Sequence, residues 1–405
     1  MSKPRRLDRL LDRRAFVQAL AGAALAAPAF LRHGRAADAS PRFALGIASG
    51  SPTADSVVLW TRLVGDDLDA PDAAEVPVAW EVADDEAFTR IVARGSEPAR
   101  AADAHSVHLQ VGGLAPARWY WYRFTALGQR SPVGRTRTAP APGDAAAARL
   151  EFAIASCQRW DQGHWAAWRD AAAQPLDLVL FLGDYIYEYA SPPNAVRAHE
   201  GGAATTLAGY RARYAQYKTD PALQAAHAAA PWLVIWDDHE VENDYAGLQG
   251  ERLQPDFAAR RAAAYRAWWE HMPLPPSLRP VEAGGGAMTI HGRLDWGNLV
   301  RLMWIDTRQF RDPQLCPRAR GGGSNTVHLR DCPGLVRESA RTLLGPAQER
   351  WLADSWSAAP PWNLLAQQTL MARCTREAVQ VPATPDMEPA QMQGRYWTDG
   401  WDGYP

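Results

Sequence analysis

Three short apolar segments, each followed directly by polar and ionisable residues, constrain the fold of this chain most strongly. The segments are residues 152–155, 178–182 and 232–236. Helical patterns over residues 165–173 and 207–230 lie between them. Buried strands that alternate with helices predict an α/β layer architecture. Residues 299–305 are expected to add a fourth strand, and residues 364–370 a fifth.

A polar cluster ends each of the first three strands. Residues 156–158 read SCQ, residues 183–188 read GDYIYE and residues 237–243 read DDHEVEN. Sites in open α/β sheets lie just beyond the carboxyl ends of the strands, so the clusters can converge in one crevice. Gly183 permits a sharp turn, and Asp184 offers a hard oxygen ligand at the rim. Because unpaired buried charges are costly, a bound cation would neutralise such a group, and the pattern predicts a metal site.

Each cluster taken alone has a simpler interpretation. Gly-Asp-Tyr after a strand is often only a turn, and a lone Cys157 is more often a small buried hydrophobic residue than a ligand. Asp-Asp-His-Glu can cap a helix by accepting hydrogen bonds from free amides. The occurrence of all three in order, at strand ends, favours the metal site.

The segment that precedes the α/β region is expected to be a separate all-β domain. Residues 56–61, 76–82 and 119–124 are short runs rich in β-branched and aromatic residues, separated by turn-forming residues. They predict a sandwich over residues 42–140, broadly of the fibronectin or immunoglobulin type, with 134–140 as its last strand. Residues 141–148 are read as a linker. The second domain is then expected over residues 150–405.

The first 39 residues are typical of a targeting segment. The pair Arg13-Arg14 precedes an uncharged run, 19–31, that is too short to span a bilayer comfortably, and Ala37-Asp38-Ala39 resembles a signal peptidase site. The order resembles a twin-arginine export signal. It predicts a periplasmic or secreted protein whose partner during export is the twin-arginine translocon. An N-terminal amphipathic or anchoring helix is the alternative.

Charge and cysteine content narrow the possible functions. The whole chain has a formal net charge of -2, and removal of residues 1–39 leaves it near −7, because that segment is basic. An acidic chain without a basic stripe is a poor candidate for tracking a nucleic-acid backbone. No later segment is long and apolar enough to anchor the mature chain in a membrane. Cys316 and Cys332 flank a loop rich in Gly, Arg and Pro and could form a disulfide.

These motifs together resemble a known family. Gly183-Asp184 and the later Asp-His-Glu are similar to the conserved sequence motifs of calcineurin-like metallophosphoesterases. The longer sequences around them resemble those of the PhoD-like alkaline phosphatases. The matching segments are residues 155–158, 182–188, 236–243, 260–265, 306–311 and 401–405. The resemblance runs from about residue 42 to the last residue. It implies a metallophosphoesterase-like αββα sandwich preceded by the small all-β domain.

The resemblance also implies a set of metal ligands. Cys157 and Tyr187 would bind Fe(III) as thiolate and phenolate, and Asp184 would bridge the metals. Asp238 occupies the position of an asparagine ligand in the broader superfamily, while Asp237 and Asn243 are weaker candidates for the calcium side. Zinc or manganese is the alternative to iron and calcium.

Other residues are expected to face the substrate. His239 would face the phosphate, and either Arg260 or Arg261 would contact it through its fork of donors. The activity implied is hydrolysis of small phosphate monoesters through in-line attack by a metal-activated hydroxide. A phosphodiesterase or phospholipase D-like activity is the first alternative. An exported binding module with an inactive site is the second.

One block of the family is not found. PhoD-like enzymes have a further Gly-Asp-x-His block well after the segment that residues 401–405 match, and His291 and His328 do not lie in such a block. We therefore expect the chain to be incomplete at its C-terminus, with an incomplete metal site, negligible phosphatase activity as given and poor solubility.

Overall fold

A six-stranded sheet forms the centre of the computed structural model. The model describes residues 41–68, 75–281, 286–318, 321–328, 331–338, 340–372 and 395–404. These residues belong to one compact unit, Ser40–Pro405. The predicted export segment and Cys374 lie outside the described residues. Within the described part of the chain, no helix is long and apolar enough to span a membrane.

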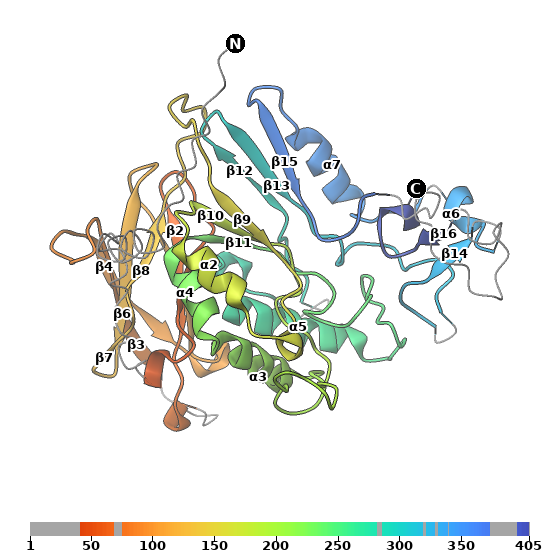
Figure 1. Ribbon diagram of the computed structural model, residues 1–405, viewed down its shortest axis with the longest axis horizontal. Coiled ribbons are helices and arrows are strands. Elements are labelled where there is room, and N and C mark those ends of the chain that lie inside the picture. The colour runs from red at the N-terminus through yellow and green to blue at the C-terminus, as the bar shows by residue number, and fades with distance from the viewer. Residues whose placement is uncertain are drawn as a thin grey trace, which may run out of the picture. The chain divides into compact units, whose positions relative to one another are not determined.

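The three predicted strands lie side by side at one end of this sheet, whose order is β5-β2-β1-β11-β10-β9 (Figure 1). They are β9 (Phe152–Ala155), β10 (Leu178–Phe181) and β11 (Trp232–Val234). All three pair in parallel. Their carboxyl ends therefore meet at one edge, and the polar clusters that follow them are brought together.

The N-terminal region is all β, as predicted, but its strands divide between two sheets. β1 (Ile47–Gly50), β2 (Val57–Arg62) and β5 (Ser106–Val111) continue the central sheet, because β1 pairs with β11. The remaining strands form an antiparallel sheet of β3 (Val76–Ala83), β4 (Ile91–Ala99), β6 (Trp119–Ala126), β7 (Gln129–Arg130) and β8 (Gly134–Arg137). An apolar core that includes Leu59 and Val78 contains residues of both sheets. The domain boundary near residues 140–150 stays a prediction.

Helices and a second sheet cover opposite faces of the parallel strands. Val179 and Phe181 belong to the core beneath the helices, whereas Leu178 and Leu180 belong to the core beneath the second sheet. The helices are α2 (Ala166–Ala173), α3 (Leu207–Lys218), α4 (Pro221–Ala229) and α5 (Phe257–His271). This alternation follows from the period of two along a strand, and it makes β10 and β11 buried on both faces. The edge strand β9 is only partly buried, and its Ile154 is exposed.

The second sheet completes the layers. It consists of β12 (Gly292–Trp296), β13 (Val300–Trp304) and β15 (Trp362–Ala366), and α7 (Pro346–Ser355) packs Trp351 and Leu352 into a cluster with Leu365 of β15. The predicted αββα architecture is confirmed. A smaller pair, β14 (Thr326–His328) and β16 (Arg395–Trp397), and the short helix α6 (Gly334–Arg337) lie in the C-terminal part. The predicted pair Cys316 and Cys332 forms a disulfide there.

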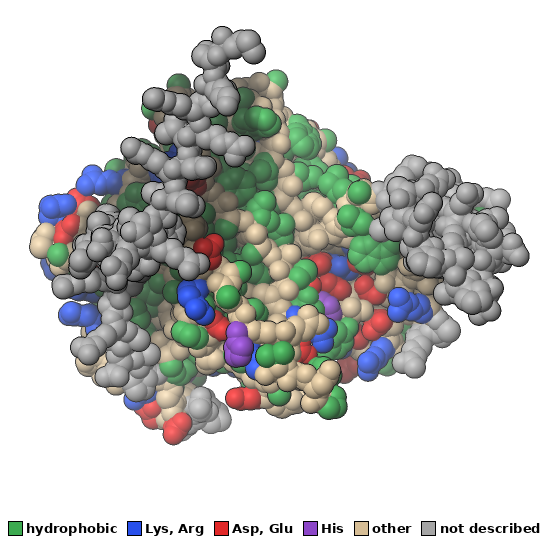
Figure 2. Space-filling model, in the orientation of Figure 1, with side chains coloured by type: hydrophobic (Ala, Val, Ile, Leu, Met, Phe, Trp, Pro, Cys, Tyr) green, Lys and Arg blue, Asp and Glu red, His purple; other side chains and the backbone are tan. Residues whose placement is uncertain are grey.

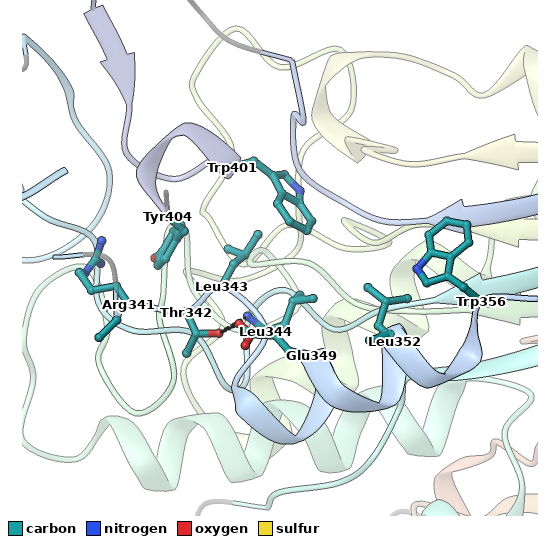
Figure 3. Close-up of a pocket in the computed structure, with 11 residues that line it drawn as sticks. Arg341, Thr342, Leu343, Leu344, Glu349, Leu352, Trp356, Trp401 and Tyr404 are labelled. Carbon is teal, nitrogen blue, oxygen red and sulfur yellow. Dashed lines mark hydrogen bonds between the residues drawn. The ribbon is translucent and has the colours of Figure 1, made fainter. Parts of the chain in front are cut away.

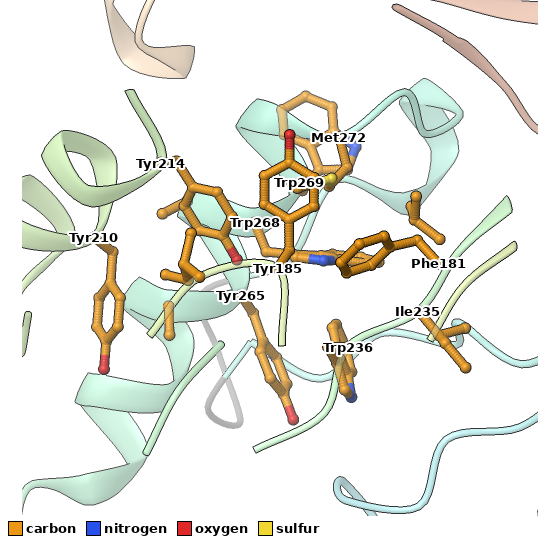
Figure 4. Close-up of a cluster of buried hydrophobic side chains, with 14 of the residues drawn as sticks. Phe181, Tyr185, Tyr210, Tyr214, Ile235, Trp236, Tyr265, Trp268, Trp269 and Met272 are labelled. Carbon is orange, nitrogen blue, oxygen red and sulfur yellow. The ribbon is translucent and has the colours of Figure 1, made fainter. Parts of the chain in front are cut away.

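Aromatic side chains fill the core between the helices and the sheet (Figure 4). Trp236, just after β11, stacks on Tyr265 of α5 with ring centroids 4.0 Å apart. Tyr210 and Tyr214 of α3 are fully buried in the same cluster. This core fixes α5 and α3 against the strand ends that carry the polar clusters.

The single helix predicted over residues 207–230 is in fact two helices. The first ends at Lys218, and Asp220 caps the second, because its side chain accepts hydrogen bonds from the N–H groups of Ala222 and Leu223. Pro221 takes the first helical position, where it loses no hydrogen bond. The sequence Asp-Pro therefore marks a boundary that the helical pattern alone does not show.

Candidate metal centre

Two strand ends at the predicted site adopt a left-handed backbone conformation. Cys157, after β9, has φ 56°, and Asp184, after β10, has φ 57°. Residues other than glycine rarely adopt this backbone conformation, and those that do cluster at functional sites. The two turns are joined because Cys157 N donates to Gly183 O (3.1 Å) and Gln158 N donates to Asp184 O (3.1 Å). The paired turns direct both side chains to the same edge of the sheet.

Gly183 lets the turn after β10 approach the turn after β11. Its φ is 104°, and a Cβ atom there would overlap the backbone of Asp237. Glycine is the residue that meets both conditions without strain. The Gly-Asp step of the motif is thus required by the contact between the two turns.

Three buried residues could hold a metal ion together. Asp184, Asp238 and His239 each offer one ligand atom, and these atoms lie within 4.8 Å of one another. Two of the three are predicted metal ligands. His239 was expected to face phosphate, and the geometry also allows its ring nitrogen as a ligand. The structure thus brings together side chains that lie more than fifty residues apart in sequence.

Tyr187 and Cys157 adjoin the same carboxylate. Tyr187 Oη donates a hydrogen bond to Asp184 Oδ2 (2.9 Å), and the His239 backbone N–H donates to Asp184 Oδ1 (3.4 Å). The Cys157 side chain interacts with both Asp184 and Tyr187. Its exposure places this thiol at the solvent side of the site. The predicted iron ligands Cys157, Asp184 and Tyr187 therefore form one group.

Glu240 joins the turns after β10 and β11, a role that the sequence analysis did not assign. Its buried carboxylate accepts hydrogen bonds from the backbone N–H groups of Asp184 (3.0 Å), Tyr185 (2.5 Å) and Asp237 (2.8 Å). Three such bonds tie the two motifs to each other. The motif Asp-Asp-His-Glu contained this residue, but only the fold shows which N–H groups it meets.

Glu188 orients His239, and this role was also missed. Glu188 Oε2 lies 2.8 Å from His239 Nδ1, and its Oε1 accepts the Asn243 backbone N–H at 2.8 Å. With Nδ1 held by a buried carboxylate, Nε2 is the nitrogen that remains for a ligand. The last residue of Gly-Asp-Tyr-Ile-Tyr-Glu is therefore part of the site.

Asp237 takes part in a buried ion-pair network. Arg308 donates from Nε to Asp237 Oδ1 (2.5 Å) and lies 3.4 Å from Asp238 Oδ1. The other edge of its guanidinium makes a paired contact with Asp399 (2.8 and 2.9 Å), which Arg311 also contacts (2.6 Å). The expectation that Asp237 faces a calcium ion stays a prediction, since one of its oxygens is committed to Arg308.

The remaining predicted residues make other contacts. Arg260 donates to Tyr210 Oη (2.9 Å) and pairs with Glu242 (2.9 Å), and Arg261 Nη1 donates to Gly247 O (2.8 Å). Asn243 donates its backbone N–H to Glu188 Oε1. The structure therefore does not bring these three side chains into the group around Asp184, and their roles toward phosphate or calcium stay predictions.

The electrostatics of the group favour a cation. Burial raises the pKa of Asp184 well above its ordinary value, and the charges of Asp238 and Asp237 raise it further. Burial and the Asp184 charge raise the pKa of the Cys157 thiol to about 12. The pKa of His239 rises to about 10, because Asp238 and the Glu188 hydrogen bond outweigh the effect of burial. A bound cation would reverse the penalty on the anionic forms of the carboxylates and thiol.

The pKa of Asp238 is shifted in the opposite direction from that of Asp184. Burial acts to raise its pKa, but the Arg308 and His239 charges outweigh this and hold the pKa below its ordinary value. Asp238 is thus available as an anionic ligand. On the face that Figure 2 shows, acidic side chains gather beside Arg and His side chains.

A cavity of about 510 Å³ lies elsewhere, between α7 and the 3-10 helix η9 (Trp401–Gly403) (Figure 3). Its lining includes Arg341, Leu352, Trp356 and Tyr404. None of the predicted site residues lines it. The cavity therefore gives no support to a ligand site at the predicted metal centre, which rests on the strand ends instead.

Comparison with family models gives two matches. A model described as "PhoD-like phosphatase" matches residues 152–405. A model described as "PhoD-like phosphatase, N-terminal domain" matches residues 26–140. Together they cover most of the chain.

Two known proteins are similar to this chain over most of its length, one in sequence and one in both sequence and structure. Alkaline phosphatase D of Bacillus subtilis (strain 168) is 45% identical over 374 residues, which is 90% of this chain and 60% of that protein. A solved structure described as "Structure of PhoD" is 43% identical and has a TM-score of 0.77; the match covers 92% of this chain and 68% of that one. The chain thus spans less than two thirds of the length of the curated relative.

Proposed function

Because the chain belongs to the PhoD-like phosphatase family, we propose that the protein is an exported, metal-dependent phosphatase that hydrolyses small phosphate esters, monoesters in particular. The observation that carries this proposal is the convergence of Asp184, Asp238 and His239 within 4.8 Å at adjacent strand ends. Alkaline phosphatase D is the name of a relative that is 45% identical over 90% of the chain.

The donor set suits the metals that the family resemblance implies. Thiolate, phenolate and carboxylate groups are anionic donors suited to Fe3+, and Cys157, Tyr187 and Asp184 interact with one another. Carboxylate oxygens suit Ca2+, and Asp238 offers them beside the same group. When bound, the metal would lower the pKa of a water molecule and offset charge on the phosphoryl group. Zn2+ or Mn2+ remains the alternative.

The chain's own residues would position the substrate. Glu188 fixes the imidazole of His239 through Nδ1, so that Nε2, when protonated and not bound to a metal ion, can donate to a phosphate oxygen or to the leaving group. Glu240 holds the turns that carry Asp184 and Asp238 at a fixed separation, which preorganises the site. No protein nucleophile is required in this scheme.

The test is hydrolysis of p-nitrophenyl phosphate by purified protein supplied with iron and calcium. Asp184→Asn should lower the rate by at least about tenfold, since it removes the carboxylate on which the other candidate ligands converge. Asp170→Asn, the same change on the exposed side of α2, is the control. Equal rates for wild type and Asp184→Asn would refute the role of this site. Comparing bis-p-nitrophenyl phosphate would show whether diesters are preferred.

Export by the twin-arginine route is the second part of the proposal. It rests on the Arg13-Arg14 pair and the apolar run after it. Fusing residues 1–39 to a reporter should send the reporter out of the cytoplasm, and Arg13→Lys with Arg14→Lys should retain it. Export that persists in the double variant would exclude this route.

A further inference from the structure

Arg159 lies beside the candidate iron ligands, although no role has been assigned to it so far. It follows the Ser-Cys-Gln cluster directly, and its guanidinium carbon lies 5.4 Å from the ring centroid of Tyr187 and 6.0 Å from that of Tyr189. Its side chain is 28% exposed. One charged group thus meets solvent at the edge of the metal centre.

Asp161 holds this arginine in place. Arg159 donates from Nε to Asp161 Oδ1 (2.8 Å) and from Nη2 to Asp161 Oδ2 (3.2 Å), and the Asp161 side chain is only 1% exposed. The paired contact uses one edge of the guanidinium and fixes its plane. Among the described residues, Nη1 has no hydrogen-bond partner. The fork is therefore oriented with one nitrogen left for another acceptor.

The other arginines near the site are committed to protein groups. Arg308 bonds three carboxylates and is almost fully buried. Arg260 pairs with Glu242, and Arg261 is buried with one nitrogen on Gly247 O. Arg159 differs from them because it combines a contact with a candidate ligand, solvent exposure and an unused donor.

We propose that Arg159 is a specificity residue that binds a second anionic group of the substrate, a carboxylate or a further phosphate outside the ester that is cleaved. This inference rests on the proposed function, since it assumes that a phosphate group binds at the metal centre. Tyr187 contacts Arg159 through its ring and Asp184 through its hydroxyl, so the second group binds beside this ring while the cleaved ester lies at the metal centre. Substrates that carry two acidic groups are then preferred over substrates that carry one.

Binding of phosphonates tests this without any need for turnover. Propylphosphonate and 3-phosphonopropionate present the same phosphonate, and only the second carries a carboxylate. Titration calorimetry on the metal-loaded protein should show about tenfold tighter binding of 3-phosphonopropionate, the difference expected for one hydrogen bond to a charged group.

The variants separate binding from folding. Arg159→Gln should bring the ratio of the two dissociation constants close to one, but it leaves the buried Asp161 carboxylate without a partner. Arg159→Lys keeps a charge for Asp161 and has no second N–H edge, so the ratio should fall while the protein stays folded. Arg169→Gln, the same change at an exposed position on α2, should keep the wild-type ratio. A ratio near one in wild type, or an unchanged ratio in both Arg159 variants, would overturn the proposal.

Failure of this inference and failure of the proposed function give different results. If p-nitrophenyl phosphate is hydrolysed and the two phosphonates bind equally, the phosphatase stands and the Arg159 subsite does not. If the phosphonate preference is present without hydrolysis, the subsite stands and the phosphatase proposal fails. If neither phosphonate binds, the subsite proposal fails; if p-nitrophenyl phosphate is also not hydrolysed, the phosphatase proposal fails with it.

Discussion

Two groups of buried charged residues meet at Asp238, and they are built differently. On one side, Arg308 and Arg311 are paired with Asp237, Asp238 and Asp399 through contacts of 2.5 to 3.4 Å. On the other side, Asp184 lies beside Asp238, Tyr187 and Cys157, and its described contacts bring no arginine or lysine to its carboxylate. In the first group two arginines lie among three carboxylates. In the second, His239 is the basic side chain beside Asp184, and no arginine or lysine contacts that carboxylate among the described residues.

The pKa values express this difference. Burial would raise the pKa of Asp399, yet Arg308 and Arg311 keep it far below its ordinary value. Burial raises the pKa of Asp184, and neighbouring acids raise it further. We infer that the buried ion pairs support the fold, and that the acids around Asp184, which no arginine contacts among the described residues, are arranged for a ligand that brings positive charge. The predictions below test how these two groups contribute to stability and to metal binding.

The largest expected effect is loss of stability when the paired group loses its central cation. Arg308→Met would leave Asp237 and Asp399 without their shared partner, and the free energy of unfolding should fall by about 3–5 kcal/mol. Urea unfolding followed by circular dichroism measures it. Arg169→Met on exposed α2 should change stability by less than about 0.5 kcal/mol. A change of similar size in both variants would mean that the network does not support the fold.

Removing the disulfide is expected to have the next largest effect. Cys316 and Cys332 are 16 residues apart, and closing a loop of this size is worth about 3 kcal/mol. The loop between them includes Ser324, which donates to Asp244, and Asn325, whose N–H donates to Thr398 beside Asp399. Cys316→Ser with Cys332→Ser should therefore lower the unfolding midpoint. Metal content should persist; its loss would mean that the loop also supports the metal centre.

The smallest effect concerns pH. Burial raises the pKa of Asp237 and Glu240 to about 7, and it raises that of Asp184 as well. An acid whose pKa is higher in the folded state contributes stability below its unfolded pKa, and that stability is lost as pH rises through the folded pKa. Metal-free protein should thus become less stable between about pH 4 and pH 7. Bound metal should remove the decline. An equal decline with and without metal would place these acids outside the metal's influence.

Much of the layered fold was predictable from residue order, because β9, β10 and β11 are apolar runs whose neighbours have helical patterns. The continuation of the sheet through β1 was not, since the pairing of Gly50 with Trp232 joins segments far apart in the sequence. Such pairing depends on tertiary packing, and no local pattern specifies it.

The same limit applies to the site. Asp184 and Asp238 were identifiable as strand-end acids, and Cys157 and Tyr187 through the family resemblance. Glu188 and Glu240 lie inside the same motifs, but their roles depend on which N–H groups the turns present. Arg308 was not assigned because one arginine in a loop resembles any other until three carboxylates surround it.

The metal content of the purified protein tests the central claim most directly. Mass spectrometry of the metal-loaded protein after dialysis should find bound metal in wild type and at least about tenfold less in Asp184→Asn, while Asp170→Asn matches wild type. The account requires that difference, because Asp184 is the carboxylate shared by the candidate ligands. Equal metal content in wild type and a folded Asp184→Asn variant would contradict it.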